Sequence, residues 1–190
     1  KIFITGASSG IGAAMAMEYA KRGAALGLAA RRKEKLEQIA QECSTQGAKH
    51  VETYSLDVKD ADASERIAKE FMSLGEEGID TVIANAGLAI SDQLSKGESS
   101  RINHLLNTNI LGVTNTIIPF IPQMKKQKQG KCVIVSSIAA FNPMPYFGGY
   151  GASKVAVRML ADSWRKTLLK HNIQFTTICP GYIKSEMTDV

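Results

Sequence analysis

Short apolar runs alternate along this chain with longer segments in which apolar residues recur at helical spacing. The runs are rich in β-branched residues and are typical of strands covered on both faces. They are Ile2–Thr5, Ala25–Ala30, Val51–Leu56, Thr81–Ala84, Cys132–Ser136 and Phe175–Cys179. The helical segments lie near 11–22, 33–46, 61–74, 99–126 and 152–170. This alternation predicts parallel strands with right-handed crossovers, and hence an α/β fold with a three-layer, doubly wound, Rossmann-like sheet.

The pattern fits a single domain that spans 1–190. Both ends of the pattern are interrupted. Lys1 begins almost inside the first strand, and the chain stops soon after Pro180-Gly181. We therefore expect a C-terminal element of the fold to be missing.

Composition and charge narrow the class of protein. The chain of 190 residues is 44% hydrophobic, and no stretch approaches the ~20 apolar residues of a membrane span. The net charge of +5 raises the question of nucleic-acid binding, but the basic residues are spread over the helices. The one dense cluster is Lys125, Lys126, Lys128 and Lys131, which we expect in a solvated loop. We therefore expect neither a nucleic-acid partner nor a membrane span.

Cysteines and histidines give no sign of a metal site. The three cysteines lack CxxC or metal spacing and are typical of reduced thiols in a reducing compartment. The three histidines have neither metal spacing nor a nucleophile partner. These residues are Cys43, Cys132, Cys179, His50, His104 and His171. We expect a cytoplasmic protein without a metal.

A glycine-rich turn, TGASSGIG at 5–12, joins the first strand to the first helix. Small residues let a backbone approach a pyrophosphate, and the helix N-terminus offers unpaired N–H groups with positive partial charge. The glycines are spaced four and then two positions apart, so the GxGxxG fingerprint is not met. A tightly packed turn is the alternative, but the position directly after a strand favours a dinucleotide site.

Tyr150 and Lys154 are four positions apart and share one face if they lie on a helix. Free tyrosine has a pKa of about 10, so a proton donor near neutrality needs about 4 kcal/mol of stabilisation of its phenolate. A unit charge about 4 Å away at an effective dielectric constant of 20 supplies about that amount. The pair therefore indicates a general acid, although a core tyrosine beside a solvated lysine is a common alternative.

Several motifs together resemble those of the short-chain dehydrogenase/reductase family. They are TGASSGIG, Asn85-Ala86-Gly87 after the fourth strand, Ser137, and the YGASK run that begins at Tyr150. The glycine pattern TGxxxGxG of the family is met in full, whereas its NNAG motif reads Ala84-Asn85-Ala86-Gly87 here. The resemblance covers nearly the whole chain, and the motifs occur in the family's order.

The resemblance implies a catalytic set of Asn109, Ser137, Tyr150 and Lys154. Tyr150 would act as general acid in reduction or general base in oxidation, and Ser137 would polarise the substrate carbonyl. Lys154 would lower the pKa of Tyr150 and hold the nicotinamide ribose. Ser136 also ends the fifth strand, but the separation of thirteen positions from Tyr150 favours Ser137.

Asn109 matches the family's helix asparagine within Asn109-Ile110-Leu111-Gly112 and would position a water between Lys154 and solvent. Asn107 lies nearby, and asparagines within a helix are often surface residues.

The cofactor is expected to be NADP(H) rather than NAD(H). A carboxylate at the end of the second strand would bind a ribose 2′-hydroxyl, whereas arginine accommodates a 2′-phosphate. This chain has Arg31 and Arg32 there, and we place Arg31 first. The alternative is that both merely begin the next helix, although a helix N-terminus disfavours cations.

The remaining cofactor contacts follow from the resemblance. Asp57 and Val58 would flank the adenine, although Asp57 could instead only cap a turn, and Ser185 stands where relatives usually carry threonine. The full set is Gly6, Ser8, Ser9, Gly10, Ile11, Gly12, Arg31, Arg32, Asp57, Val58, Asn85, Ala86, Gly87, Tyr150, Lys154, Pro180, Gly181, Ile183 and Ser185.

Three functions are compatible with parts of this pattern. The first is an NADP(H)-dependent oxidoreductase that interconverts a small-molecule carbonyl and alcohol, and the second is a non-catalytic NADP(H)-binding regulator. The third, a nucleic-acid binder, requires a clustered basic face. Retention of Ser137, Tyr150 and Lys154 favours the enzyme, which the resemblance implies to be a homodimer or homotetramer. The sequence does not name the substrate, although an apolar pocket wall is indicated by Phe141, Pro143, Met144, Phe147 and Met187.

Overall fold

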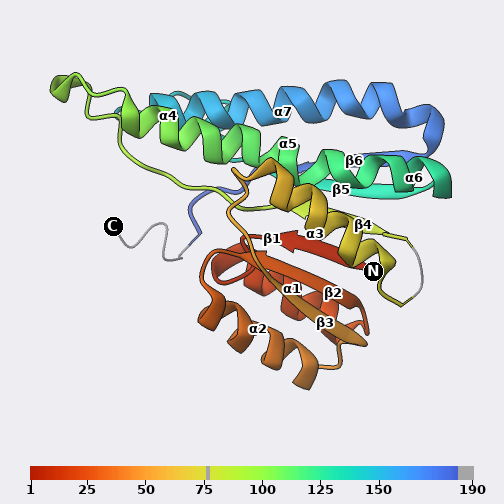
Figure 1. The fold of residues 1–190 in the computed structure, drawn as a ribbon. Coiled ribbons are helices and arrows are strands. Elements are labelled where there is room, and N and C mark those ends of the chain that lie inside the picture. The colour runs from red at the N-terminus through yellow and green to blue at the C-terminus, as the bar shows by residue number, and fades with distance from the viewer. Residues whose placement is uncertain (76–77, 184–190) are drawn as a thin grey trace.

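A six-stranded parallel sheet forms the centre of the molecule, with strand order β3-β2-β1-β4-β5-β6 (Figure 1). The computed structural model describes residues 1–75 and 78–183. The strands are β1 (Ile2–Thr5), β2 (Ala25–Ala30), β3 (His50–Ser55), β4 (Thr81–Ala84), β5 (Gly130–Val135) and β6 (Ile173–Ile178). The order reverses between β1 and β4, which makes this a doubly wound sheet. The fold class predicted from the alternation of strands and helices is confirmed.

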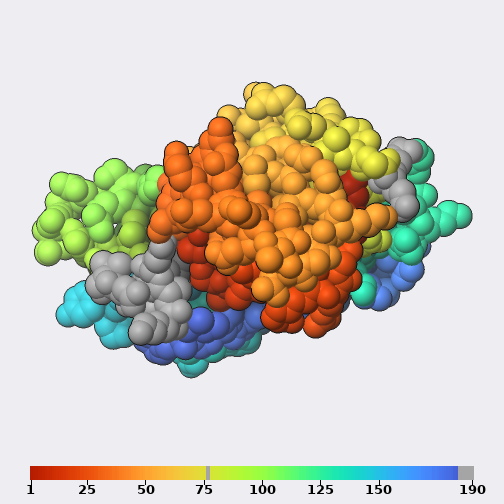
Figure 2. Space-filling view, turned by 90° about the horizontal axis from the view of Figure 1, so that it is seen from below, coloured from red at the N-terminus to blue at the C-terminus, as the bar shows by residue number. Residues whose placement is uncertain are grey.

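Helices cover both faces of the sheet. The α-helices are α1 (Gly10–Lys21), α2 (Lys33–Thr45), α3 (Ala61–Ser73), α4 (Ser100–Leu106), α5 (Gly112–Ile117), α6 (Ile121–Gln127) and α7 (Gly148–Leu168). Short helical segments are η1 (Leu94–Lys96), η2 (Asn107–Leu111), η3 (Ile118–Phe120), η4 (Ile138–Ala140) and η5 (Leu169–His171). Figure 2 shows the face covered by α2 and β3, beyond which the segment around residues 95–105 projects on one side.

Two separate hydrophobic clusters fill the spaces between the sheet and its helices. One lies under α1 and α2 and includes Ile4, Leu28 and Leu36. The other lies under α3, α5, α6 and α7 and is built around four aromatic rings whose centroids are 5.1–6.3 Å apart. These rings belong to Phe3, Tyr54, Phe71 and Phe120. Side chains of alternating direction along each strand feed both clusters, which explains the nearly continuous apolar runs in the sequence.

Some boundaries differ from those predicted. Strands β3, β5 and β6 each begin and end one or two residues earlier than their apolar runs. The last long helix begins at Gly148 rather than at 152, because its first backbone N–H groups find an acceptor outside the helix. Tyr150 therefore lies within the first turn of α7 instead of before it.

The single helix predicted over 99–126 is interrupted in its hydrogen bonding. The chain keeps a right-handed helical backbone but passes through a π-helical turn at Asn107–Leu111 and a 3-10 turn at Ile118–Phe120. Pro119 and Pro122 cannot donate backbone hydrogen bonds, which accounts for the break into α5, η3 and α6. The π-helical turn includes Asn109, and such turns are frequent at functional sites.

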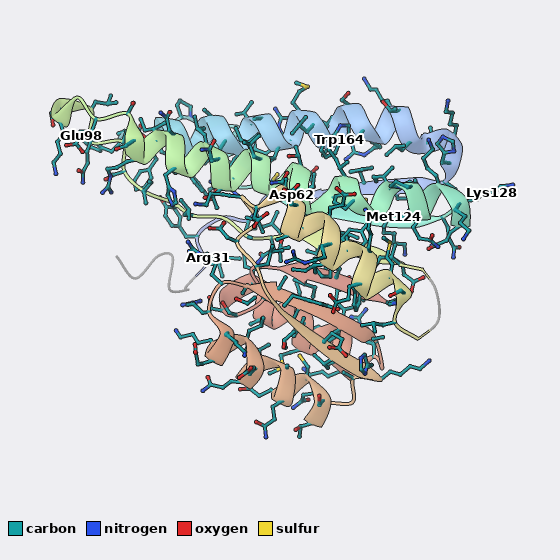
Figure 3. The ribbon with its side chains drawn as sticks, in the orientation of Figure 1. Arg31, Asp62, Glu98, Met124, Lys128 and Trp164 are labelled. Atoms are coloured by element: carbon teal, nitrogen blue, oxygen red, sulfur yellow. The ribbon has the colours of Figure 1, made fainter. Side chains whose placement is uncertain are left out.

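The lysine cluster is exposed to solvent as expected, but only Lys128 lies in a turn between elements. Lys125 and Lys126 lie in the last turn of α6, Lys128 adopts a left-handed conformation at the end of that helix, and Lys131 lies in β5. Lysines in a last helical turn interact favourably with the negative end of the helix dipole. Lys128 points away from the body of the molecule (Figure 3), and the cluster spans the end of α6 and the start of β5.

Candidate active site

The glycine-rich turn lies at the point where the strand order reverses, between the C-terminal ends of β1 and β4. Asn85, directly after β4, donates from its side-chain amide to the carbonyl oxygens of Thr5 and Gly6, at 3.1 and 3.2 Å. Thr5 Oγ1 in turn accepts from the backbone N–H of Asn85 at 3.3 Å. The predicted Asn85 thus holds the glycine turn against the neighbouring strand and opens a crevice beside it.

Close packing leaves room only for glycine at position 12. A Cβ atom at this position would lie 2.3 Å from the carbonyl oxygen of Gly6 and 2.6 Å from Nδ2 of Asn85. Gly6 has a φ of +68°, a conformation that glycine adopts without strain. The turn therefore keeps its backbone exposed to the crevice while α1 packs tightly beneath it.

The crevice forms a pocket that encloses about 280 Å³. Most of the predicted cofactor residues line it, from the glycine turn, the ends of β2 and β3, and the loop after β4. These are Gly6, Ser8, Ser9, Gly10, Ile11, Arg31, Arg32, Asp57, Val58, Asn85, Ala86 and Gly87. Ala30, Leu56, Leu88 and Thr108 also line the pocket and were not predicted. Thr108 could have been found from its place beside Asn109, whereas nothing in the sequence singles out the three apolar residues.

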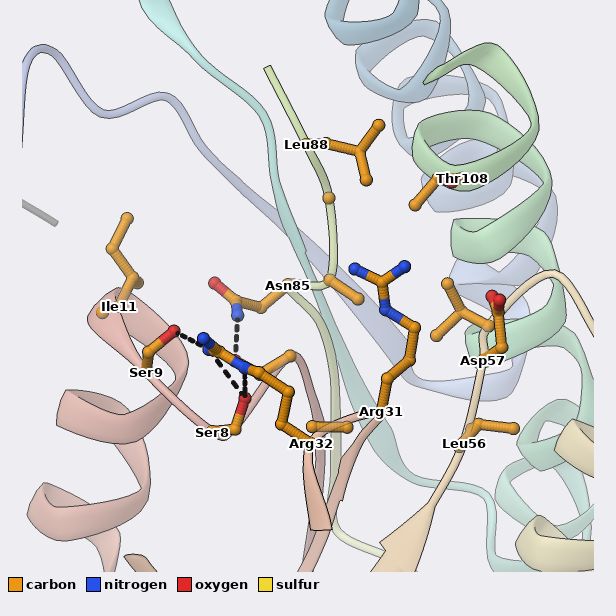
Figure 4. Close-up of a pocket in the computed structure, with 16 residues that line it drawn as sticks. Ser8, Ser9, Ile11, Arg31, Arg32, Leu56, Asp57, Asn85, Leu88 and Thr108 are labelled. Carbon is orange, nitrogen blue, oxygen red and sulfur yellow. Dashed lines mark hydrogen bonds between the residues drawn. The ribbon is translucent and has the colours of Figure 1, made fainter. Parts of the chain in front are cut away.

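The two arginines enter the pocket differently (Figure 4). Arg32 folds back onto the glycine turn, where its Nη2 atom donates to Ser9 Oγ at 2.7 Å and to Ser8 Oγ at 3.1 Å. Its Nε atom lies 3.3 Å from the same Ser8 oxygen. Arg31 instead extends from the end of β2 across the pocket, beside Asp57. This end of the pocket therefore carries two guanidinium groups and two hydroxyls, a combination suited to a phosphate.

Lys154 lies beside Tyr150, one helical turn further along α7. Its ammonium nitrogen is 5.6 Å from the centroid of the Tyr150 ring and donates to the carbonyl oxygen of Val135 at 3.0 Å. Only 6% of the Lys154 surface is exposed, and this burial lowers the pKa of its ammonium to about 8. Cys179, which lies nearby, opposes part of that decrease in the Lys154 pKa.

Asn109 connects the loop after β4 to the helix that carries Tyr150. Its Oδ1 atom accepts from Leu88 N at 2.9 Å, and its Nδ2 atom donates to Leu88 O at 2.9 Å and to Ser153 Oγ at 3.0 Å. The Ser153 hydroxyl donates to the carbonyl oxygen of Tyr150 at 2.7 Å. Asn109, Ser153, Tyr150 and Lys154 are therefore brought together by direct contacts.

Gly87 joins this group to the pocket. A Cβ atom on Gly87 would lie 3.2 Å from Asn109 Oδ1 and 3.6 Å from Lys154 Nζ. Gly87 also lines the pocket, whereas Lys154 is not among the lining residues, so Gly87 lies between the pocket and the buried ammonium. A group bound there could come close to both side chains only because this position has no side chain.

The two serines after β5 have different contacts. Ser136 Oγ donates to the backbone carbonyl of Lys154 at 2.9 Å and thereby ties β5 to α7. Ser137 caps η4, where its Oγ atom accepts from the backbone N–H of Ala139 at 3.1 Å. The backbone N–H of Ile138 donates to Pro180 O at 3.0 Å, so the predicted Pro180-Gly181 segment lies beside this turn. Ile183 follows it and is partly exposed, while Ser185 and Met187 lie outside the described residues.

Two other features of the described ranges bear on function. Neither the helices at 1–75 nor those at 78–183 include one both long and apolar enough to cross a membrane. Within the same ranges no group of three or more His, Cys, Asp or Glu side chains is placed to hold a metal ion. Cys43 and Cys132 are buried free thiols, and burial raises the pKa of Cys132 to about 12.

Comparisons with known proteins identify the family of this chain. The family model for short chain dehydrogenases matches residues 1–190. An uncharacterized oxidoreductase of Myxococcus xanthus is 36% identical over 186 residues, which cover 97% of this chain and 72% of the relative. An 11-beta-hydroxysteroid dehydrogenase 1A of Arabidopsis thaliana is 37% identical over 189 residues, which cover 98% of this chain but only 53% of that protein.

Solved structures share the fold over almost all of the chain. An alcohol dehydrogenase from Thermococcus sibiricus, complexed with 5-hydroxy-NADP, has a TM-score of 0.87 and 33% identity, covering 96% of this chain and 76% of the other. A gluconate 5-dehydrogenase from Burkholderia cenocepacia, in complex with NADP and tartrate, has a TM-score of 0.91 and 27% identity, covering 99% and 73%. By its sequence, its fold and its relatives, this chain belongs to the short-chain dehydrogenase/reductase family of oxidoreductases.

Proposed function

We propose that this chain is an NADP(H)-dependent oxidoreductase that interconverts a small-molecule carbonyl and an alcohol through Ser137, Tyr150, Lys154 and Asn109. The observation that carries the proposal is the position of the Lys154 ammonium, buried, 5.6 Å from the Tyr150 ring, and next to the Gly87 edge of the pocket. A buried cation stabilises a nearby phenolate far more than an exposed one does, because water screens it less.

The protein's own groups handle the proton and the orientation. Tyr150 donates its hydroxyl proton to the carbonyl oxygen during reduction and accepts it back during oxidation. Lys154 stabilises the phenolate that remains, and Asn109 joins the helix that carries both residues to the loop after β4. Ser137, at the end of β5, polarises the carbonyl by hydrogen bonding. The bound nicotinamide supplies or accepts the hydride.

The pocket fits a dinucleotide with a 2′-phosphate. The glycine turn leaves no room for a Cβ atom at Gly12 and presents its backbone at the N-terminus of α1, where pyrophosphate oxygens are stabilised. Arg31 and Arg32 lie at the end of β2, where NAD-binding proteins carry a carboxylate. The NADP bound by the gluconate 5-dehydrogenase and the NADP analogue bound by the archaeal alcohol dehydrogenase support the same preference.

Substitution of the arginines tests the cofactor preference. We expect Arg31→Ala and Arg32→Ala to weaken NADPH binding by about 10- to 100-fold, since a charge-assisted hydrogen bond contributes about 1.5–3 kcal/mol. The larger loss is expected for Arg31, because Arg32 is already bonded to Ser8 and Ser9. Titrations followed by nucleotide fluorescence would measure NADPH and NADH affinities. Arg22→Ala removes an equal charge outside the pocket and should change neither affinity. Equal affinity of the wild type for both cofactors would refute the preference.

Turnover distinguishes the enzyme from a non-catalytic binding protein. NADPH oxidation should be screened against aldehydes and ketones of increasing size, with each compound that is active then tested in the Tyr150→Phe variant. A chain that binds NADPH tightly but oxidises it with no carbonyl in the panel would favour the regulator.

Assembly and location stay predictions. Three large apolar side chains near α5 and on α7 are more than half exposed, namely Leu111, Ile118 and Met159. Such exposed apolar side chains support a homodimer or homotetramer. A cytoplasmic location is likewise still an expectation from the cysteine pattern.

A further inference from the structure

Asp92 caps the helix that carries Tyr150, although the two segments are far apart in the sequence. Its Oδ2 atom accepts from Gly148 N at 2.6 Å, and its Oδ1 atom accepts from Gly149 N at 3.1 Å. The residue belongs to the loop after β4 and is only 7% exposed. A buried carboxylate therefore takes up two of the backbone N–H groups that an α-helix leaves without partners at its N-terminus.

Helix α7 has no cap of its own. Its N-cap residue, Phe147, has no side-chain hydrogen bond to the helix, and no acidic residue lies in the first turn. The helix begins instead with two glycines. A Cβ atom at Gly148 or Gly149 would lie 2.9 or 3.1 Å from an Asp92 oxygen, so only glycines let the carboxylate approach this closely. Glycines are poor helix formers, and this turn therefore depends on the distant carboxylate.

The backbone of Asp92 supports the same turn from its other side. Its N–H donates to the carbonyl oxygen of Tyr146 at 2.8 Å. Tyr146 has a φ of +66°, a left-handed conformation that is uncommon for a bulky residue and is kept only when its surroundings impose it. Asp92 thus makes three hydrogen bonds to the entry of α7 within four residues of Tyr150.

We propose that Asp92 is a positioning residue, which fixes the first turn of α7 so that the Tyr150 hydroxyl is held at the reacting carbonyl. The inference rests on the proposed role of Tyr150. Reaction rates fall steeply when a reacting group is displaced by as little as about 1 Å, so loosening of one helical turn is enough to slow catalysis. The negative charge of the Asp92 carboxylate also interacts favourably with the positive end of the α7 dipole.

The effect is expected to be local, because the helix beyond its first turn is held independently. Ser153, Lys154, Val157 and Ala161 of α7 are buried against the sheet side. Ser136 Oγ binds the carbonyl of Lys154, and the Lys154 ammonium binds Val135. Loss of the Asp92 carboxylate would therefore free the Tyr150 turn while leaving Lys154 and the pocket in place.

Substitutions at Asp92, compared with a matched cap elsewhere, test the proposal. We expect Asp92→Ala to lower kcat at least tenfold with an NADPH affinity within twofold of wild type. Asp92→Asn retains one acceptor oxygen, so its kcat should fall only about threefold. Asp60 caps α3 by accepting from Ala63 N at 2.9 Å, so Asp60→Ala removes a helix-capping carboxylate from a helix without catalytic residues. Asp60→Ala should lower Tm by about as much as Asp92→Ala does, but it should leave kcat unchanged.

Three results would overturn the proposal. One is a kcat within twofold of wild type in Asp92→Ala, or in Asp92→Asn if the alanine variant does not fold. The second is an equal loss of NADPH affinity, which would mean that the whole site is damaged. The third is an equal loss of kcat in Asp60→Ala, which would assign the effect to general destabilisation.

Amide hydrogen exchange separates this proposal from the proposed function, since it needs no substrate. The amides of Gly148, Gly149 and Gly151 should exchange at least tenfold faster in Asp92→Ala, while those of residues 154–161 keep their protection. If the wild type reduces no carbonyl, the proposed function fails, and these exchange rates alone decide whether Asp92 holds the turn. Unchanged exchange at the three glycines would refute it.

Discussion

Tyr150→Phe is expected to lower kcat for carbonyl reduction by about 10³-fold while NADPH affinity stays within twofold. General acid catalysis by a positioned side chain contributes about 10²- to 10⁴-fold, and phenylalanine has no proton to donate. Phenylalanine retains the aromatic ring, whose centroid lies 5.6 Å from the Lys154 ammonium in the wild type, so the packing at this position is preserved. Single-turnover measurement of NADPH oxidation would report the chemical step without interference from product release.

The control is a tyrosine on the loop that leads into the same helix. Tyr146→Phe removes a hydroxyl from a side chain that is 79% exposed and should leave kcat unchanged. A Tyr150→Phe variant that retained more than a fifth of wild-type turnover would show that another group donates the proton.

Lys154→Met is expected to abolish the pH dependence that this lysine gives to folding stability. The folded pKa of about 8 lies below the ordinary value of 10.5, so the unfolded chain binds more protons between those pH values. Below pH 8 the buried charge lowers the free energy of unfolding of the wild type by its full amount. As the pH rises from 8 toward 10.5, this free energy of unfolding increases. At about 1.4 kcal/mol per pH unit, the wild type should gain about 3 kcal/mol relative to the variant over this interval.

Denaturant unfolding at pH 7, 8, 9 and 10 without cofactor would measure this difference. Ionisable groups that lie away from Lys154 titrate in the same way in both proteins, so their contributions cancel in the comparison. Lys166→Met makes the same change at an exposed position of α7 and should differ from wild type by a constant amount. A constant difference for Lys154→Met as well would contradict the depressed pKa. The variant should also lose turnover, so that one substitution affects stability and activity independently.

Most of the fold could be predicted because strand and helix periodicities are local properties of the sequence. β1, β2 and β4 were predicted with their observed bounds, since each is a continuous apolar run that ends at a polar or small residue. The start of α7 was not, because its capping group is Asp92, which lies 56 positions from Gly148. The interruptions at Asn107–Leu111 and Ile118–Phe120 likewise depend on contacts and prolines that helical periodicity does not register.

The candidate site divides in a similar way. Arg31 and Arg32 were identified by their place after the second strand, but the bonds from Arg32 to Ser8 and Ser9 could not be predicted. They require the exact separation of two loops that only the packed sheet defines. Asn109 was assigned a role in placing a water, and the structure adds direct contacts to Leu88 and Ser153. Side-chain identity was readable from motifs, whereas the partners of each polar atom were not.

The reversal of strand order has a consequence for assembly of the protein. β1 precedes the other five strands in the sequence but lies in the middle of the sheet, and its contact with Asn85 joins residues 80 positions apart. During synthesis, β1, β2 and β3 can pair before β4 exists, while the crevice has only one wall. A nucleotide can therefore bind only after β4–β6 have packed against β1–β3. Its binding energy then stabilises the contact between these two halves of the sheet.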